Sequence, residues 1–137
     1  MKRPSRLRSN AHLILALIRF VNGALALFAP HSLAHRLDVD ADKSPALLYF
    51  QRMFGIRTIL TALDLVTGDE RELERALRRA PLIHASDATG AALAGVRGNL
   101  APGPARMTVA ISLVNLMLAL VARPQSARGL PFGLGRL

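Results

Sequence analysis

The apolar segment at residues 44–68, SPALLYFQRMFGIRTILTALDLVTG, is long enough to span a bilayer, yet it contains Arg52, Arg57 and Asp64. Ionised side chains inside such a segment are costly and need polar partners. A serine and a proline at its start and a glycine at its end are typical of helix boundaries. We therefore predict a helix over 45–67 and expect other segments to provide partners for its three charges.

Three further apolar segments favour helices at 11–28, 81–96 and 105–122. The segment 81–96 is the least apolar of the three, because it is rich in Ala and Gly and contains His84 and Asp87. The linkers are short, as connections between antiparallel neighbours are. The predicted fold class is all-α: a four-helix antiparallel transmembrane bundle formed by a membrane domain at residues 11–122.

The positive charges outside these spans predict the orientation of the bundle. Eleven Lys and Arg residues fall on the side that holds both ends of the chain and four on the other side. Cytoplasmic loops of membrane proteins carry such an excess. We therefore predict a multi-pass protein of the bacterial plasma membrane, with a basic cytoplasmic N-terminus at 1–10 and a flexible cytoplasmic tail at 123–137.

Two connections have patterns of their own. The segment 30–43 contains two histidines followed by aspartates at alternate positions. It lacks the glycine and final Glu of a calcium loop, so we predict a solvated acidic loop and no metal site. The histidines and aspartates concerned are His31, His35, Asp38, Asp40 and Asp42. The segment 69–80 begins with a capping-box pattern, which predicts a short polar helix that Pro81 ends or kinks.

Composition excludes several classes of protein. The absence of cysteine rules out disulfides, thiolate catalysis and Cys-based metal sites. A formal charge of +9 is compatible with nucleic-acid binding, but no basic stripe is interleaved with stacking aromatics. We therefore predict no nucleic-acid partner, assign no cofactor and no catalytic residue, and leave an enzymatic role uncertain. A soluble basic helical bundle remains the alternative fold.

Polar residues recur at helical spacing in each apolar segment, which predicts one inward-facing polar stripe per helix. In an antiparallel bundle with a rise of about 1.5 Å per residue, several of them reach similar depths near the midplane. The predicted intramembrane network comprises Arg19, Arg57, Asp64, His84, Asp87 and Asn115. Arg57 is its predicted centre, paired with Asp87, whereas Arg52 is expected to anchor the helix at the outer interface.

Small residues in the spans favour close helix packing, and we assign this role to Gly55, Gly90 and Gly95.

The polar network has two interpretations. It is either structural, holding the helices together, or a functional site such as a proton path or a pocket for an anionic or quinone-like ligand. The sequence predicts an accessory or ligand-binding membrane protein, with the bilayer, a lipophilic or anionic small molecule, or a larger membrane complex as partner.

The chain also resembles a known group of proteins. The stretch SLAHRLDVD after Pro30, the stretch QRMFGIR, and the helix that contains Asp87 resemble an uncharacterised family of small four-helix bacterial membrane proteins that are akin to DoxX-like proteins. The resemblance covers 18–122, and Arg52, Gly55 and Arg57 are its most specific residues. Thr58 stands where such families often have an acid. The resemblance implies a membrane location, and as an alternative function a component of quinone or redox-linked chemistry.

Overall fold

The computed structural model describes residues 6–123, and its regular structure within that range consists of five α-helices. The helices are α1 (Arg6–Phe28), α2 (Pro30–Arg36), α3 (Pro45–Thr67), α4 (Glu70–Val96) and α5 (Pro102–Ala122). The predicted all-α class is confirmed for this part of the chain. Residues 1–5 of the predicted basic N-terminus and residues 124–137 of the predicted tail lie outside the described residues.

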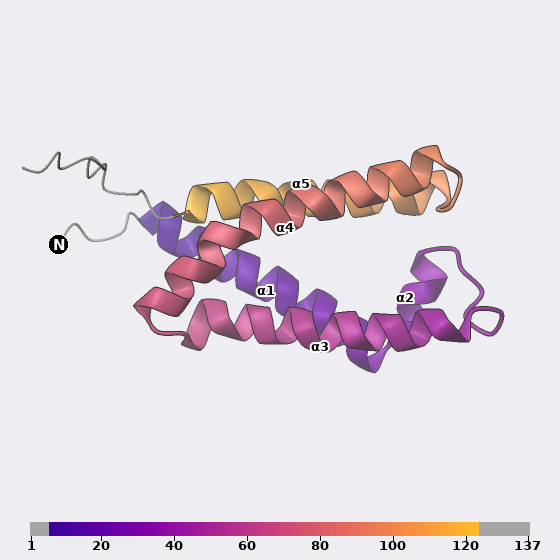
Figure 1. Ribbon diagram of the computed structural model, residues 1–137, viewed down its shortest axis with the longest axis horizontal. Coiled ribbons are helices and arrows are strands. Elements are labelled where there is room, and N and C mark those ends of the chain that lie inside the picture. The colour runs from indigo at the N-terminus through magenta and orange to yellow at the C-terminus, as the bar shows by residue number, and fades with distance from the viewer. Residues whose placement is uncertain (1–5, 124–137) are drawn as a thin grey trace, which may run out of the picture.

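The four long helices alternate in direction and form two packed pairs (Figure 1). One pair is α1 with α3 and the other is α4 with α5, and α1 also packs against α5. The contact between α3 and α4 is less extensive than any of these three. The molecule is therefore two helix pairs joined mainly through α1 and α5.

Only two of the described helices are long and apolar enough to cross a membrane, at Asn10–Phe28 in α1 and Pro102–Ala122 in α5. Two charged arginines and an aspartate lower the hydropathy of α3, and the first half of α4 is dominated by Arg and Glu. The four predicted spans are thus all helical, but hydropathy singles out only the first and the last.

The predicted boundaries of α3 and the predicted start of α4 are confirmed. Helix α3 begins at Pro45 after Ser44 and ends at Thr67, with Gly68 as its C-cap. The capping box of α4 is formed, because Asp69 Oδ1 accepts from the Glu72 backbone N–H at 2.8 Å and Glu72 Oε2 accepts from the Asp69 backbone N–H at 3.2 Å. These signals act within one turn of chain, so a local pattern suffices to predict them.

The predicted polar helix and the predicted third span are one continuous helix. Helix α4 is 27 residues long and contains Pro81 in its interior. Figure 1 shows the first turns of α4 rising away from α3 before the helix runs along α5. Proline inside a helix removes one backbone hydrogen bond and commonly bends the axis. Of the two predicted effects of Pro81, the structure therefore shows a bend rather than an end.

The predicted loop at 30–43 is partly helical, which corrects the sequence-based expectation. Helix α2 takes up its first half, with Pro30 in the first turn, where proline is favoured. Pro30 and Ala34 are buried because α2 packs against both α1 and α3. Within the described residues no group of three potential ligands surrounds a metal-sized site.

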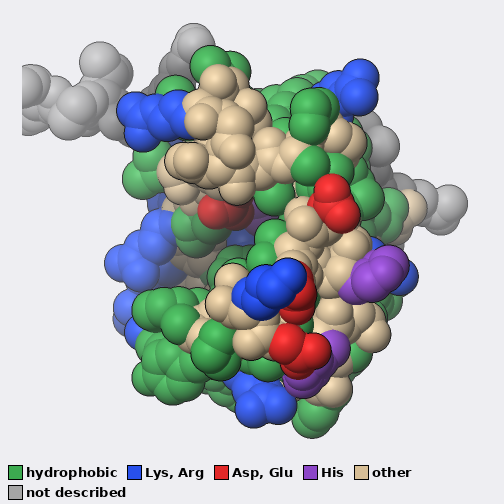
Figure 2. All heavy atoms as spheres, turned by 90° about the vertical axis from the view of Figure 1, so that its right-hand side faces the viewer, with side chains coloured by type: hydrophobic (Ala, Val, Ile, Leu, Met, Phe, Trp, Pro, Cys, Tyr) green, Lys and Arg blue, Asp and Glu red, His purple; other side chains and the backbone are tan. Residues whose placement is uncertain are grey.

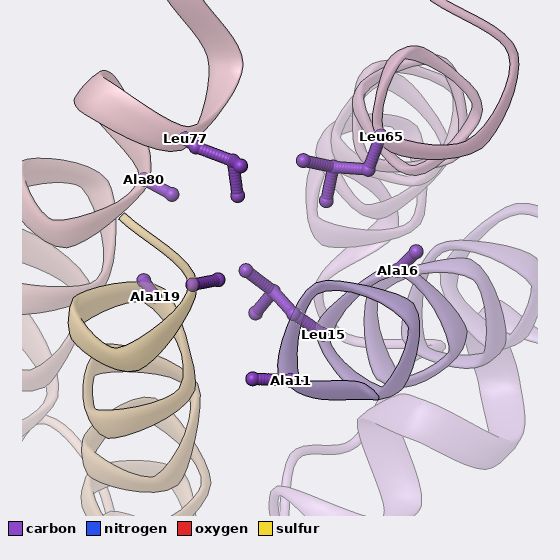
Figure 3. Packing of buried hydrophobic residues seen from close by; sticks show 8 residues of the cluster. Ala11, Leu15, Ala16, Leu65, Leu77, Ala80 and Ala119 are labelled. Atoms are coloured by element: carbon purple, nitrogen blue, oxygen red, sulfur yellow. The ribbon is translucent and has the colours of Figure 1, made fainter. Parts of the chain in front are cut away.

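The buried core is composed mostly of alanine. Leu15 is the only large side chain that is fully buried among the described residues, and it points into a cluster to which α1, α3, α4 and α5 all contribute (Figure 3). The cluster contains Ala11, Leu15, Ala16, Leu65, Leu77, Ala80, Ala119 and Ala122. Small side chains allow the helices to approach closely.

Large apolar side chains, by contrast, lie on the outside of all four long helices. There are 24 of them, including Phe28 of α1, Phe50 of α3, Leu82 of α4 and Met117 of α5. A soluble helical protein buries such residues and exposes polar ones. Here large apolar side chains are exposed alongside most of the charged ones, and the core holds mainly alanine with a few polar residues.

Candidate functional site

Arg19 of α1 and His84 of α4 form the centre of the polar interior. Arg19 is 7% exposed and His84 3% exposed, and Arg19 Nη1 lies 3.0 Å from His84 Nε2. Every other side-chain hydrogen bond among the described residues joins groups within four positions of each other. This bond is therefore the one polar side-chain link between the two helix pairs in that part of the chain.

The donors and acceptors of the pair decide which ring nitrogen of His84 carries the proton. A guanidinium has five N–H donors and no acceptor. His84 Nε2 must therefore accept, which places the imidazole proton on Nδ1 and leaves the ring neutral. The hydrogen bond therefore gives Arg19 Nη1 an acceptor but does not neutralise the charge of the guanidinium.

Asp87 lies one turn beyond His84 on α4. Its Oδ2 is 3.6 Å from His84 Nδ1, which is longer than a hydrogen bond, and His84 Nδ1 has no closer partner. Because His84 is neutral in this arrangement, the contact is not an ion pair. The Asp87 side chain is 44% exposed, so the array runs from buried Arg19 through neutral His84 to a carboxylate that is accessible from outside.

The position of this array follows from the core below it. Leu15, Ala80 and Ala119 belong to the buried cluster. One turn further in the same direction along α1, α4 and α5 are Arg19, His84 and Asn115. Asn115 is 5% exposed, and its Oδ1 has no hydrogen-bond partner. A polar layer therefore lies directly on the alanine-rich layer.

The structure does not place Arg57 and Asp64 in this layer, which corrects the predicted network. Helix α3 turns Gln51, Gly55, Thr58, Ala62 and Leu65 toward its neighbours, and these residues are buried. Arg57 and Asp64 lie about 120° to 140° around the helix from that face and are exposed. Among the described residues neither forms an ion pair.

The cause of this difference is helix rotation. Sequence spacing shows that Arg57 shares a face with Thr61, whose Oγ1 donates to the Arg57 carbonyl at 2.8 Å. The close packing of Gly55 against α1 decides that the opposite side of α3 points inward. Arg52, the predicted outer anchor, is also exposed and lies on a different side of α3 from Arg57.

A groove of about 360 Å³ lies between α3 and α4. It is lined by Thr61, Asp64, Glu72, Arg75, Ala76, Arg79 and Ile83. Figure 2 looks at the opposite end of the molecule, where α2 and the connection between α4 and α5 lie, and shows that the two halves are separated by a hollow there as well. Asp64 thus belongs to the groove rather than to the buried layer. Ile83, which also lines the groove, is the chain neighbour of His84.

Arg75 and Arg79 are groove residues that the sequence analysis did not single out. They are one turn apart on α4 and share their face with Ala76 and Ile83. The signal was present in the spacing of arginines within ERELERALRR, but the segment was interpreted as a separate solvated helix. A second, more polar hollow of about 450 Å³ lies on the outer side of the same turns, where Arg78 pairs with Glu74.

The three predicted packing glycines have different surroundings. A Cβ on Gly55 would lie 2.6 Å from the Leu27 backbone nitrogen and 2.7 Å from the Gly23 carbonyl oxygen. A Cβ on Gly95 would lie 2.7 Å from Ala105 Cβ, so α4 and α5 are also close there. Gly90 has open space around it and is not a packing residue within the described structure. Gly23, which packs against Gly55 from α1, was not predicted.

No protein-family model, curated protein or solved structure matches this chain. The resemblance to DoxX-like proteins therefore stays a prediction. The residues themselves provide a buried cation, a neutral imidazole, an accessible carboxylate and an adjacent groove. Such an arrangement is suited to binding a polar group within an apolar surrounding or to holding a proton.

Proposed function

We propose that this chain is a multi-pass integral protein of the bacterial plasma membrane, in which α1, α3, α4 and α5 span the bilayer and both termini are cytoplasmic. The observation that carries the proposal is the exposure of large apolar residues on all four long helices around a core of alanine and a few polar residues. Lipid tails solvate an apolar exterior, whereas water would drive it to aggregate.

The exposed apolar residues of α4 support its membrane-spanning half. Leu82, Ile83, Leu93 and Val96 are all exposed, and no large apolar residue is exposed between Glu70 and Pro81. The polar first turns of α4 suit the cytoplasmic interface, and the half beyond Pro81 suits the hydrocarbon.

Helix α1 is also unlike a cleaved signal peptide or a soluble core helix. It supplies Arg19 to the polar layer and Gly23 to the contact with α3, so the fold depends on it. Only 33% of its apolar window is buried, whereas a core helix of a soluble protein is mostly buried. Its exposed face suits lipid.

We propose further that the protein binds a ligand through the layer of Arg19, His84 and Asp87 and the groove between α3 and α4. Buried ionisable groups in membrane helices are rare and commonly belong to a binding or transport site. The neutral imidazole between a cation and an anion leaves both charges without a direct ionic partner. A purely structural network would bring the charges into contact.

Membrane extraction tests the first proposal. The full chain is expressed in bacteria, and membranes are washed with alkaline carbonate and then solubilised with a mild detergent. The protein is expected to resist carbonate and to require detergent. Recovery in the soluble fraction without detergent would favour the soluble basic bundle instead.

A further inference from the structure

The charge of Arg19 has no matching anion in direct contact. Its one hydrogen-bond partner is the neutral acceptor His84 Nε2, and Arg19 Nε has no partner. The nearest carboxylate of the array, Asp87, lies on the far side of the imidazole. A buried guanidinium is strongly stabilised by an oxyanion, which accepts two charge-assisted hydrogen bonds, and only weakly by a neutral ring.

His84 is therefore the weaker of two possible partners for Arg19. Charge-assisted hydrogen bonds are roughly twice as strong as neutral ones. An oxyanion that reaches Arg19 would satisfy the unpartnered Nε as well as neutralise the charge. The imidazole, once released, keeps its Nδ1 proton for Asp87, which is already within 3.6 Å.

The groove between α3 and α4 lies at the depth of Arg19. Gly23 of α1 packs against Ile59 of α3. Arg19, one turn before Gly23, is therefore level with Thr61 and Asp64 in the antiparallel α3. Ile83, the chain neighbour of His84, also lines the groove, and the volume of about 360 Å³ falls in the range of small-molecule sites. Arg75 and Arg79 line the same groove and form no ion pair within residues 6–123.

The acidic groups of the groove oppose these cations only in part. Glu72 Oε2 already accepts from the Asp69 backbone as part of the capping box. Asp64 lies on the α3 wall, and Arg57 follows on the same face of α3, two turns deeper. The groove is thus lined by two arginines, Arg75 and Arg79, and two acidic residues, of which Glu72 is already engaged in the capping box.

From these features we propose that Arg19 binds the oxyanion headgroup of a lipophilic anion, whose alkyl chain leaves sideways between α3 and α4. The proposal rests on the proposed membrane location and specifies the ligand class of the proposed site. The headgroup is a carboxylate or a phosphate. The exposed apolar residues beside the opening, Ile83 and Leu82, suit an alkyl chain that continues into the bilayer.

Direct binding to the full chain in phosphatidylcholine nanodiscs tests this proposal. The probes are radiolabelled hexadecanoate and hexadecyl phosphate at alkaline pH, with hexadecanol as the neutral comparator. At least one acid is expected to bind about tenfold or more tightly than the alcohol, in line with the loss of one charged partner. The two acids distinguish a carboxylate site from a phosphate site. Equal binding of both acids and the alcohol would overturn the proposal.

Two variants locate the site. Arg19→Gln is expected to remove the preference for the acid. Arg52→Gln, which removes an exposed charge on α3, is expected to leave the preference intact. If Arg19→Gln does not fold, Ile83→Trp replaces it, because this change fills the groove at an exposed position. Ile83→Trp is expected to weaken acid binding about tenfold or more while circular dichroism stays unchanged. Wild-type acid binding by folded Arg19→Gln or by folded Ile83→Trp would contradict the proposal.

Carbonate extraction of the same variants separates the two proposals. A protein that remains in the membrane but shows no acid preference would contradict the ligand and leave the membrane location intact. A protein that is soluble without detergent would contradict the membrane location, whatever it binds.

Discussion

Arg19 and Arg57 lie in similar apolar sequences, but they have opposite surroundings in the fold. Arg19 is buried against His84, and Arg57 is exposed on α3. The difference decides which arginine is expected to affect the free energy of unfolding when it is substituted. A buried donor that loses its partner is destabilising, whereas Arg57 has no side-chain partner among the described residues to lose.

A double-mutant cycle on Arg19 and His84 checks this assignment. Arg19→Met and His84→Leu are each expected to lower the free energy of unfolding by about 1 to 3 kcal/mol, because each leaves a buried polar partner unpaired. The double variant is expected to be milder than the sum of the two, by about 0.5 to 3 kcal/mol. Unfolding in mixed detergent micelles provides the measurement.

The Arg57 and Asp87 pair is the control for this cycle. The sequence favoured an ion pair between these two residues, but the structure shows none. Their substitutions are therefore expected to add within about 0.5 kcal/mol. Additive effects at Arg19 and His84, or strong coupling at Arg57 and Asp87, would contradict the polar layer described above.

Asp40, in the connection between α2 and α3, gives a pH-dependent prediction. A hydrogen bond from Lys43 lowers the pKa of Asp40 below its ordinary value, and the two side chains are 3.1 Å apart. A lowered carboxyl pKa contributes stability at neutral pH, and the contribution is lost as pH falls through the folded-state pKa. Because the pair is exposed, the effect on stability is expected to be small.

Carbon-13 NMR titration of the Asp40 carboxyl checks this shift. Lys43→Ala is expected to return the pKa toward the ordinary value of an aspartate. A titration midpoint that is the same in both proteins would mean that the ion pair is not formed in solution.

At the scale of the helices, the contact of α1 with α3 depends on two glycines. Gly23 and Gly55 face each other so closely that any Cβ meets backbone atoms of the neighbouring helix. Backbone atoms move only with the whole helix, so the clash is not relieved by a side-chain rotation. This contact fixes the rotation of α3 and therefore the outward position of Arg57.

Glycine substitutions measure this contact. Gly55→Ala is expected to destabilise the protein by about 1 to 3 kcal/mol through overpacking. Gly90→Ala is the matched control, because a Cβ there meets no atom within van der Waals range and alanine is the better helix former, so it is expected to stabilise by about 0.5 to 1 kcal/mol. Thermal unfolding in detergent compares the two, and equal effects would mean that the α1 and α3 helices are not in close contact.

At the scale of the whole molecule, the apolar exterior and the alternating helices together predict a topology. The connection between α2 and α3 and the connection between α4 and α5 lie at one end of the molecule, and the turn between α3 and α4 lies at the other (Figure 1). The excess of Lys and Arg predicts that this turn lies on the cytoplasmic side.

Cysteine labelling checks this topology, and the absence of native cysteine makes each introduced thiol the only one. Asp42→Cys, Asn99→Cys and Glu70→Cys are placed at exposed positions of the two outer connections and the cytoplasmic turn. In intact spheroplasts a membrane-impermeant maleimide is expected to label positions 42 and 99, and to label position 70 only after permeabilisation. Equal labelling of all three, or none before permeabilisation, would contradict the proposed arrangement.

The sequence alone determined the features that depend on neighbouring residues. The boundaries of α3, the capping box of α4 and the bend at Pro81 each follow from contacts within one or two turns. The helical class and the order of the four long helices follow from apolar periodicity and short linkers. Sequence spacing also placed Arg19 and Asn115 at similar depth, because helical rise is constant.

Only the tertiary structure decided which side of each helix faces inward. Periodicity groups residues on a face but does not show what that face meets, and the approach of Gly55 to α1 turned Arg57 and Asp64 outward. The same rotation left the polar link between the helix pairs to Arg19 and His84, and opened the groove that contains Arg79. The identity of the buried pair was thus decided by close backbone packing between helices, which cannot be predicted from residue spacing along the chain.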